Sequence, residues 1–369
     1  MTGLVARALG LSAQQLLQAF IPATAEHLAG VVALRQALFG ADIHWDDAAY
    51  LAWRYRFGSK AQGRGDCWVL VLGEQVAGMV GTEEIELQRG EERIAAWSTM
   101  DIAIEQRFEG SGLGSWMNLR LCAAAGCTLT IGSNAKSRNM ITRMFRRLPD
   151  RRSYLLPIRF QRMVRKRLGT WVGGRVVAPI VETLAALWRA LALPGARGQI
   201  ELRAITHFGS DAAELLLWAA DPEEWRVARS VEFLNWRLFG NPRARYAVVG
   251  AYLHGTLYGY MATMLRTDGS GTISVVIVDW AVDQTRFRAA FRALCADAVR
   301  TAIRERAELV SASVYHARSE GFLRRAGFMP RFDPYETIAV YSTDEAELNR
   351  LLAPAPWFIT EINTDRDNL

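Results

Sequence analysis

Hydrophobic and polar residues alternate along three consecutive stretches in the first third of the chain. These stretches are 67–73, 75–87 and 93–105. Alternation with a period of two is typical of half-buried strands, and the short turns between the stretches favour antiparallel neighbours. The pattern predicts an antiparallel meander, preceded by a short strand near 17–23 and by a helix over 24–39 that is capped by Thr24.

The elements after the meander follow a helix, strand, helix order. They are expected over 115–126, 127–133 and 137–147. The second half repeats the whole order, with strands over 243–255, 256–267 and 271–283, a helix over 285–305, a strand over 308–315 and a helix ending at Gly327. We therefore expect an α/β (α+β) fold of two tandem units, each with a mixed, mainly antiparallel central sheet flanked by helices.

Sequence matches between the two halves indicate a duplication. The strand end at 101–106, DIAIEQ, returns at 279–284 as DWAVDQ. Three further pairs follow the same order: Trp53-Arg54 with Trp236-Arg237, 73–80 with 255–262, and 134–137 with 316–319. Internal repeats of this kind point to one fold used twice. The copies differ in one respect: a glycine-rich loop, 110–114, follows the first strand end, and no glycine follows the second.

Composition sets the scale of the molecule. A chain of 369 residues, half of them hydrophobic, can bury two cores. We expect an N-terminal unit over 1–155, a helical insert over 156–198 and a C-terminal unit over 199–369. The N-terminal apolar run is interrupted by Gln14 and Gln15, which is a poor signal peptide and favours the cytoplasm. The four cysteines show no metal-ligand spacing, so structural thiols and no metal site are expected.

Positive charge is concentrated in one segment. The net charge is +6, yet 143–175 alone has eleven basic residues and one acidic residue, Asp150. The segment 143–193 also contains many aromatic and aliphatic residues. This combination fits an interfacial helix pair on an anionic membrane, and it equally fits an interdomain helix that packs on both cores. Nucleic acid is not expected as a partner, because it would bind the basic residues and leave the apolar face of the segment without a contact.

The glycine-rich loop has the context of an anion-binding turn. It lies between a predicted strand and a predicted helix, where backbone N–H groups and the helix dipole can hold a pyrophosphate. A turn whose glycines merely permit tight packing is the alternative. Dinucleotide binding of the Rossmann type is disfavoured, because that motif requires a parallel βαβ unit and a meander precedes this loop.

The strand, the R-x-x-G-x-G spacing from Arg107 to Gly112, the helix and the next strand with Asn134 resemble the acyl-coenzyme A signature of the GNAT superfamily. The resemblance covers roughly 15–155 and 200–345. In its tandem form, the chain resembles acyltransferases of bacterial envelope, exopolysaccharide and ceramide synthesis. The resemblance implies that acyl-CoA is the donor.

The resemblance also implies roles for individual residues. The pyrophosphate would lie on the backbone amides of Gly110, Ser111, Gly112, Leu113 and Gly114, with Arg107 at the rim. The backbone of Ile104 and Glu105 would bind the pantetheine arm, and Asn134 and Ser137 would approach the thioester. The tyrosine that the family places seven residues after that asparagine is Ile141 here, which leaves the proton donor to the thiolate in question.

An acceptor amine must lose a proton before it attacks a thioester, so a carboxylate facing the cleft is needed. Asp101 is the first candidate, because it shares a strand face with Glu105. A role in orienting strands is the alternative, favoured by its counterpart Asp279. Glu84 and Glu86 are second candidates, against a solvated strand face.

A histidine of the second copy, the duplicated Trp-Arg pairs and the C-terminal segment also lie in or near the repeat. His316, which replaces Asn134 in the second copy, is a third candidate for proton transfer, against a structural role. The duplicated Trp-Arg pairs are expected to be architectural. The C-terminal segment over 356–369 either orders across the cleft or frays.

Taken together, these features predict a cytoplasmic acyl-CoA-dependent N-acyltransferase that is peripheral on the inner membrane. The first unit would bind the donor and the second would wall the acceptor site. A long-chain amino lipid is the expected acceptor, and the amine of a polysaccharide or nucleotide sugar is the alternative. A FemAB-like aminoacyl transferase and a non-catalytic CoA-binding scaffold remain as rivals.

Overall fold

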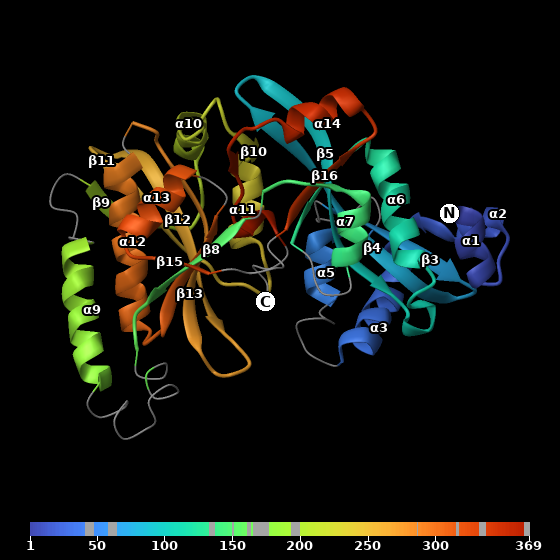
Figure 1. The fold of residues 1–369 in the computed structure, drawn as a ribbon, viewed down its shortest axis with the longest axis horizontal. Helices are drawn as coiled ribbons and strands as arrows, with labels where there is room; N and C mark the ends of the chain where they lie inside the picture. The colour runs from blue at the N-terminus through green and yellow to red at the C-terminus, as the bar shows by residue number, and fades with distance from the viewer. Residues whose placement is uncertain are drawn as a thin grey trace.

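Two mixed sheets with helices on their faces lie side by side (Figure 1). The computed structural model describes residues 1–40, 48–57, 65–132, 137–149, 151–160, 164, 177–192, 200–285, 287–314, 317–331 and 337–364. Within these residues the sheets have ten and seven strands. The expected fold of two tandem units, each with a mixed sheet between helices, is confirmed.

The first sheet is built around the predicted meander. Its strands are β1 (Phe20–Pro22), β2 (Tyr55–Arg56), β3 (Gly65–Leu72), β4 (Gln75–Arg89), β5 (Glu92–Ile104), β6 (Cys127–Ile131), β7 (Arg146–Arg147), β10 (Trp225–Val227), β16 (Ile338–Ser342) and β17 (Trp357–Phe358). β3, β4 and β5 are antiparallel neighbours, as expected. β6 runs parallel to β5 but pairs with it only at Trp97 and Ser98. Beyond Ser98 the two strands separate.

Helices cover both faces of this sheet. They are α1 (Thr2–Ala8), α2 (Ala13–Ala19), η1 (Ala25–His27), α3 (Leu28–Phe39), α5 (Ala48–Arg54), η2 (Gln106–Phe108), α6 (Leu113–Ala125) and α7 (Arg138–Met144). On one face α3 and α5 bury Leu34 and Leu51 against Met79. On the other face α1, α2 and α6 bury Leu16 and Trp116. The helix predicted from Thr24 therefore begins as a 3-10 turn and continues as α3.

The second sheet repeats the arrangement. Its strands are β8 (Arg152–Pro157), β9 (Ile200–Ile205), β11 (Ala247–Leu253), β12 (Thr256–Thr267), β13 (Ile273–Val282), β14 (Leu309–Val314) and β15 (Met329–Arg331). Its helices are α10 (Ser210–Trp218) and α11 (Val231–Phe239) on one face, and α12 (Phe287–Arg304) and α13 (Ala317–Arg325) on the other. β13 and β14 pair in parallel only up to Ile277. The separation of β5 from β6 in the first sheet therefore recurs between β13 and β14 in the second.

Each half of the chain supplies a strand to the sheet of the other half. β8 follows the elements of the first unit but pairs with β14 and β15. β16 follows the second unit but pairs with β6. The expected boundary at 155 lies within β8. The physical reason for this exchange is that β6 and β14 would otherwise present an edge of unpaired N–H and C=O groups.

The duplicated Trp-Arg pairs meet where the units touch. The rings of Trp53 and Trp236 stack with their centroids 4.7 Å apart and their planes inclined by 22°. Arg54 lies over the ring of Trp236 at 5.7 Å, and Arg237 lies over the ring of Trp53 at 5.8 Å. The contact is reciprocal, as in an interface with twofold symmetry. These contacts fit the expected architectural role of the duplicated pairs.

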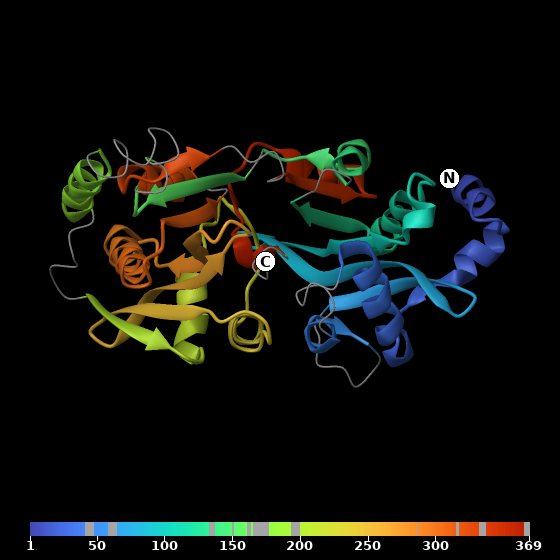
Figure 2. The same cartoon turned by 90° about the horizontal axis from the view of Figure 1, so that it is seen from below.

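The remaining described elements are α9 (Ala178–Ala192), α14 (Glu345–Leu352) and η4 (Glu361–Asn363). The C-terminal segment 357–364 is ordered between the units, because β17 pairs with β10 and η4 contacts β13. α9 lies at the outer edge of the second unit, on the side away from the first (Figures 1 and 2). It is therefore not a helix between two cores. None of the described helices is both long and apolar enough to cross a membrane.

Candidate functional site

The glycine-rich loop forms an open turn at the start of α6. Gly110 and Gly112 have φ angles of +82° and +83°, a region that side chains disfavour. The Ser111 hydroxyl donates to the carbonyl of Phe108 at 2.6 Å and accepts from the N–H of Leu113 at 3.3 Å. No acidic residue lies in the first turn of α6. The turn and the helix start can therefore accept an anion.

At the corresponding strand end of the second copy, a carboxylate bonds to the residues that follow it. Asp283, the counterpart of Glu105, accepts from the N–H of Thr285 at 2.6 Å and from its hydroxyl at 2.5 Å. The two copies differ in the glycine-rich turn itself, which follows the strand end of the first copy and has no glycine counterpart in the second.

The end of β5 presents its backbone to the gap left by β6. Ile104 lies opposite Gly78 in a pair without hydrogen bonds, so its N–H and C=O point away from β4 and toward the gap. Glu105 differs from the expectation, because its N–H donates to the carbonyl of Ala77 at 2.9 Å. Its carboxylate instead lies 2.9 Å from Arg107, whose guanidinium stays exposed at the rim of the loop.

Asp101 occupies a bulge in β5 and is held by two partners. Its φ is +52°, and the pairing with β4 shifts register at this point. The Tyr55 hydroxyl donates to one carboxylate oxygen, and Arg35 lies 3.4 Å from the other. Burial would raise the pKa of Asp101, but Arg35 and Tyr55 together hold the pKa below its usual value. A carboxylate so stabilised is a weak proton acceptor.

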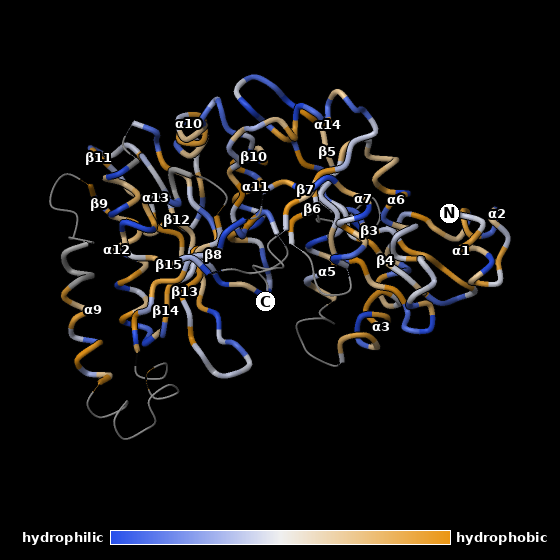
Figure 3. The backbone as a smooth tube through the Cα atoms, in the orientation of Figure 1, coloured by the Kyte–Doolittle hydropathy of each residue, from blue (hydrophilic) through white to orange (hydrophobic). Residues whose placement is uncertain are grey.

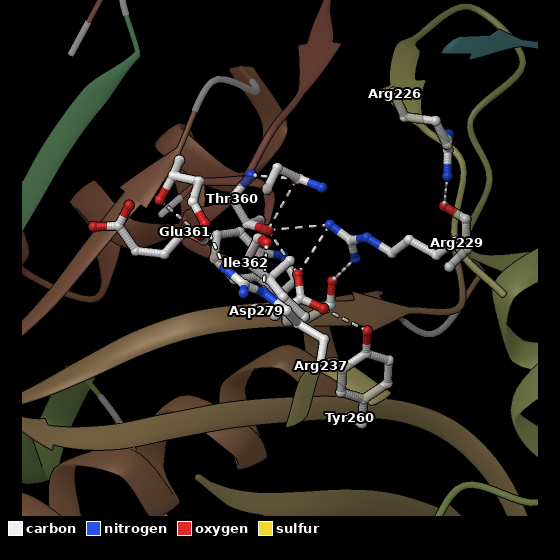
Figure 4. A network of polar contacts seen from close by, with 12 residues as sticks. Arg226, Arg229, Arg237, Tyr260, Asp279, Thr360, Glu361 and Ile362 are labelled. Carbon is white, nitrogen blue, oxygen red and sulfur yellow. Dashed lines mark hydrogen bonds and ion pairs between the residues drawn. The ribbon is translucent and has the colours of Figure 1, made fainter. Parts of the chain in front are cut away.

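Asp279 repeats this arrangement in the copy without the loop (Figure 4). Tyr260 donates to it at 2.5 Å, Arg229 lies 2.9 Å away, and the Thr360 hydroxyl donates at 2.7 Å. Here burial dominates and raises the pKa. A bulge aspartate with tyrosine and arginine partners therefore occurs whether or not a loop follows, which favours the strand-orienting alternative for Asp101.

The glutamates of β4 lie in contrasting surroundings. The side chain of Glu84 is 66% exposed and 3.9 Å from Arg56, and Glu86 is an exposed partner of Arg93. The side chain of Glu83 is only 10% exposed and lies 3.0 Å from Arg54. Glu83 pairs across the strands with Ser98, where β5 and β6 separate.

A cleft of about 660 Å³ separates the two units beside these glutamates. Its lining residues include Glu83, Glu84, Glu86 and Trp97 of the first unit and Arg229, Ser230 and Phe233 of the second. A second, small cavity at the separation of β5 and β6 is lined by Glu83, Ser98, Met100, Leu129, Ile131 and the C-terminal Ile362. Glu83 lines both. The candidates chosen from the sequence included Glu84 and omitted Glu83.

The remaining expected site residues differ in their placement. Ser137 precedes α7, and its carbonyl accepts from the N–H of Ile141 at 3.0 Å. The Ile141 side chain is buried against Cys122 and Phe145, so this position turns into the core. Asn134 and His316 lie outside the described residues.

All four cysteines are buried and unbridged. Burial raises the pKa of Cys122 to about 11 and that of Cys127 to about 12, so neither thiol is a ready nucleophile. Among the described residues, no three His, Cys, Asp or Glu side chains are grouped so that they could hold a metal ion.

Comparison with known proteins places the fold. No model of a protein family matches the chain, and no curated protein sequence matches it. Solved structures do match. A GCN5-related N-acetyltransferase from Anabaena variabilis is 11% identical, with a TM-score of 0.60 over 88% of this chain and 72% of that chain.

Two further structures each cover 88% of the chain. Saccharomyces cerevisiae N-myristoyltransferase, solved with bound myristoyl-CoA, is 11% identical over 83% of its length, with a TM-score of 0.55. A tandem GNAT protein from the clavulanic acid biosynthesis pathway is 12% identical over 98% of its length, with a TM-score of 0.52. The chain therefore has the fold of the GCN5-related N-acetyltransferases in its tandem form.

Proposed function

We propose that this chain is an acyl-CoA-dependent N-acyltransferase, with its donor in the first unit and its acceptor amine in the cleft between the units. The observation that carries the proposal is the difference between the two copies. The first copy has an open glycine turn at a helix start beside a gap between strands, and in the second copy no glycine follows the strand end. A donor with a pyrophosphate fits the first place and not the second.

The donor would lie along the end of β5. The pyrophosphate would sit on the backbone amides from Gly110 to Gly114, with the Arg107 guanidinium at the rim. The pantetheine arm would enter the gap between β5 and β6, where the backbone of Ile104 faces it. This path leads the thioester toward Ser98 and the small cavity that Glu83 lines.

The acyl group is transferred directly from the thioester to the amine. The amine attacks the thioester carbonyl, a C–N bond forms, and the C–S bond breaks to release CoA thiolate, which takes up a proton. The amine must first give up its own proton, since an ammonium has no lone pair. Glu83 is our choice of proton acceptor, directly or through a water. It is paired with an arginine as Asp101 is, but it lines both the acceptor cleft and the cavity near the thioester.

Asp101, in this scheme, is a positioning residue. Both of its carboxylate oxygens are engaged, by Tyr55 and Arg35, and it shapes the bulge of β5. Ile141 is buried and has no proton to give, so the thiolate must be protonated by another group or by water. Backbone N–H groups near Ile104 would stabilise the oxyanion of the tetrahedral intermediate.

The acceptor is a long-chain amino lipid in this proposal. Carboxylates and apolar groups share the walls of the cleft, with Glu84 and Glu86 near Ile85, Trp97 and Phe233. Such walls suit a molecule that has a cationic end and an apolar chain. The amine of a polysaccharide or nucleotide sugar is the alternative acceptor, for which the carboxylates alone would serve.

The test is an acyl-transfer assay on the purified chain. Acyl-CoAs of increasing chain length are incubated with a long-chain amine or with a sugar amine, and the released thiol is measured. We expect release that depends on the amine and is faster with the long-chain amine. Faster release with the sugar amine would replace the lipid acceptor by the alternative, and no amine-dependent release would refute the enzymatic function.

A further inference from the structure

α9 exposes a stripe of large apolar side chains to solvent. Ile180, Leu184 and Leu187 follow one another at spacings of four and three residues, which places them on one face of the helix. Their exposed fractions are 56%, 61% and 60%. Figure 3 shows hydrophobic positions in the part of this helix that it colours.

The stripe is not needed to hold the helix in place. Ala178 is buried, and Val181 and Ala185 are half-buried, so a different face of α9 packs on the protein. Because that inner face already supplies the packing, the outer stripe adds apolar surface that folding does not use. An ordered row of this kind marks an interaction surface rather than scattered exposed side chains.

Exposed arginines lie on elements of the second unit. Figure 2 shows β8 and α9 along the same side of the molecule. The exposed arginines on or next to β8, α13 and β15 are Arg152, Arg159, Arg324 and Arg331. Glu320 pairs with Arg152 at 2.7 Å and with Arg324 at 3.0 Å, which offsets one charge. The sequence from 143 to 175, with eleven basic residues and one acidic residue, leads into α9.

We propose that α9 docks on an anionic membrane surface, with Ile180, Leu184 and Leu187 inserted at the level of the headgroups and the basic side facing the lipid phosphates. An apolar stripe beside a positive surface is the combination that such a membrane binds. A second copy of this chain would bring a second positive surface, which repels the first. Nucleic acid would use the arginines but leave the stripe in water. The proposal goes beyond the transfer reaction and does not depend on it.

Flotation with lipid vesicles tests the proposal. The full chain is mixed with vesicles of phosphatidylcholine and with vesicles that contain 30% phosphatidylglycerol, and the bound fraction is measured in a density gradient. We expect binding to the anionic vesicles that weakens as salt is raised. Equal binding to both kinds of vesicle, or to neither, would overturn the proposal.

A matched pair of double variants separates the stripe from general loss of apolar surface. L184Q/L187Q removes two side chains of the stripe, and the partition coefficient should fall about tenfold or more. L217Q/L265Q removes two exposed leucines of α10 and β12 and should bind like the wild type. Equal binding by L184Q/L187Q and the wild type would contradict the proposal.

Two further readouts bear on the other occupants. Gel filtration of the wild type should give a monomer. A wild-type dimer that becomes a monomer in L184Q/L187Q would assign the stripe to a second copy instead. Binding of a DNA oligonucleotide that competes with the anionic vesicles, unchanged in L184Q/L187Q, would assign the basic side to nucleic acid. Thermal unfolding of both double variants should match that of the wild type, because neither pair is buried.

Discussion

Glu83 and Glu84 are neighbours in the sequence and face different surroundings. Glu83 is buried beside Arg54 at the mouth of the gap between β5 and β6, and Glu84 is exposed. Alternation along 83–86 places Glu83 on the face of the apolar Ile85 and Glu84 on the face of Glu86, so the sequence held a signal for the enclosed glutamate. Residue types predicted that β4 supplies carboxylates, and the packing shows which of them is enclosed.

Replacing Glu83 by Gln should lower kcat by about 100-fold or more, because general-base catalysis contributes that much when the base is removed. The pH dependence of the remaining rate should follow the ionisation of the free amine. E84Q is the matched control and should keep most of the activity, since its side chain is solvated. Equal rates for E83Q and the wild type would exclude Glu83 as the base.

Replacing Asp101 by Asn should lower the free energy of unfolding by about 3 kcal/mol at pH 7, because it leaves the buried Arg35 without its counter-charge. The pKa of Asp101 is lowered in the folded state, so its contribution is present above the unfolded pKa and lost as pH falls through the folded one. The difference between variant and wild type should therefore shrink toward pH 3. Urea unfolding at several pH values measures it, and a constant difference would contradict the linkage.

At the scale of elements, the sequence pattern predicted the pairing of consecutive strands and missed the pairing of strands that are far apart in the sequence. The meander of β3, β4 and β5 follows from alternation and short turns, and it is present. The exchange of β8 and β16 was not expected, because alternation predicts a strand but does not identify the strand with which it pairs. β8 pairs with β14, which lies 150 residues or more further along the chain. Such pairing depends on which edges remain open after each half has folded.

The exchanged strands should be among the most protected parts of the molecule. β8 has neighbours on both sides, β14 and β15, and β16 lies between β6 and β7. Their amides should therefore exchange with deuterium as slowly as those of β4 and β12. Rapid exchange in β8 and β16 beside protected β4 would show that the exchange of strands adds little to the fold.

For the whole molecule, the duplication has produced one structural unit rather than two independent domains. Strands are exchanged, Trp53 stacks on Trp236, and Arg151 forms a buried pair with Glu361 of the C-terminal segment at 2.9 Å. The halves cannot separate without breaking sheet hydrogen bonds and exposing these groups.

Thermal unfolding should therefore show a single transition in calorimetry. W53A, which removes the stack between the units, should lower the temperature of that one transition, because it deletes a half-buried ring that packs on Trp236. Two separate transitions in the wild type, with W53A affecting one of them, would contradict the account of a single cooperative molecule.

The central claim is that the donor binds in the first copy alone, and calorimetric titration with coenzyme A tests it most directly. We expect one site per chain. G110D, which places a negative charge in the open turn, should weaken binding at least tenfold, because it repels the pyrophosphate. G271D changes a glycine of similar φ in the turn between β12 and β13 and should bind like the wild type. Two sites per chain, no binding at all, or equal binding by G110D and G271D would contradict the claim.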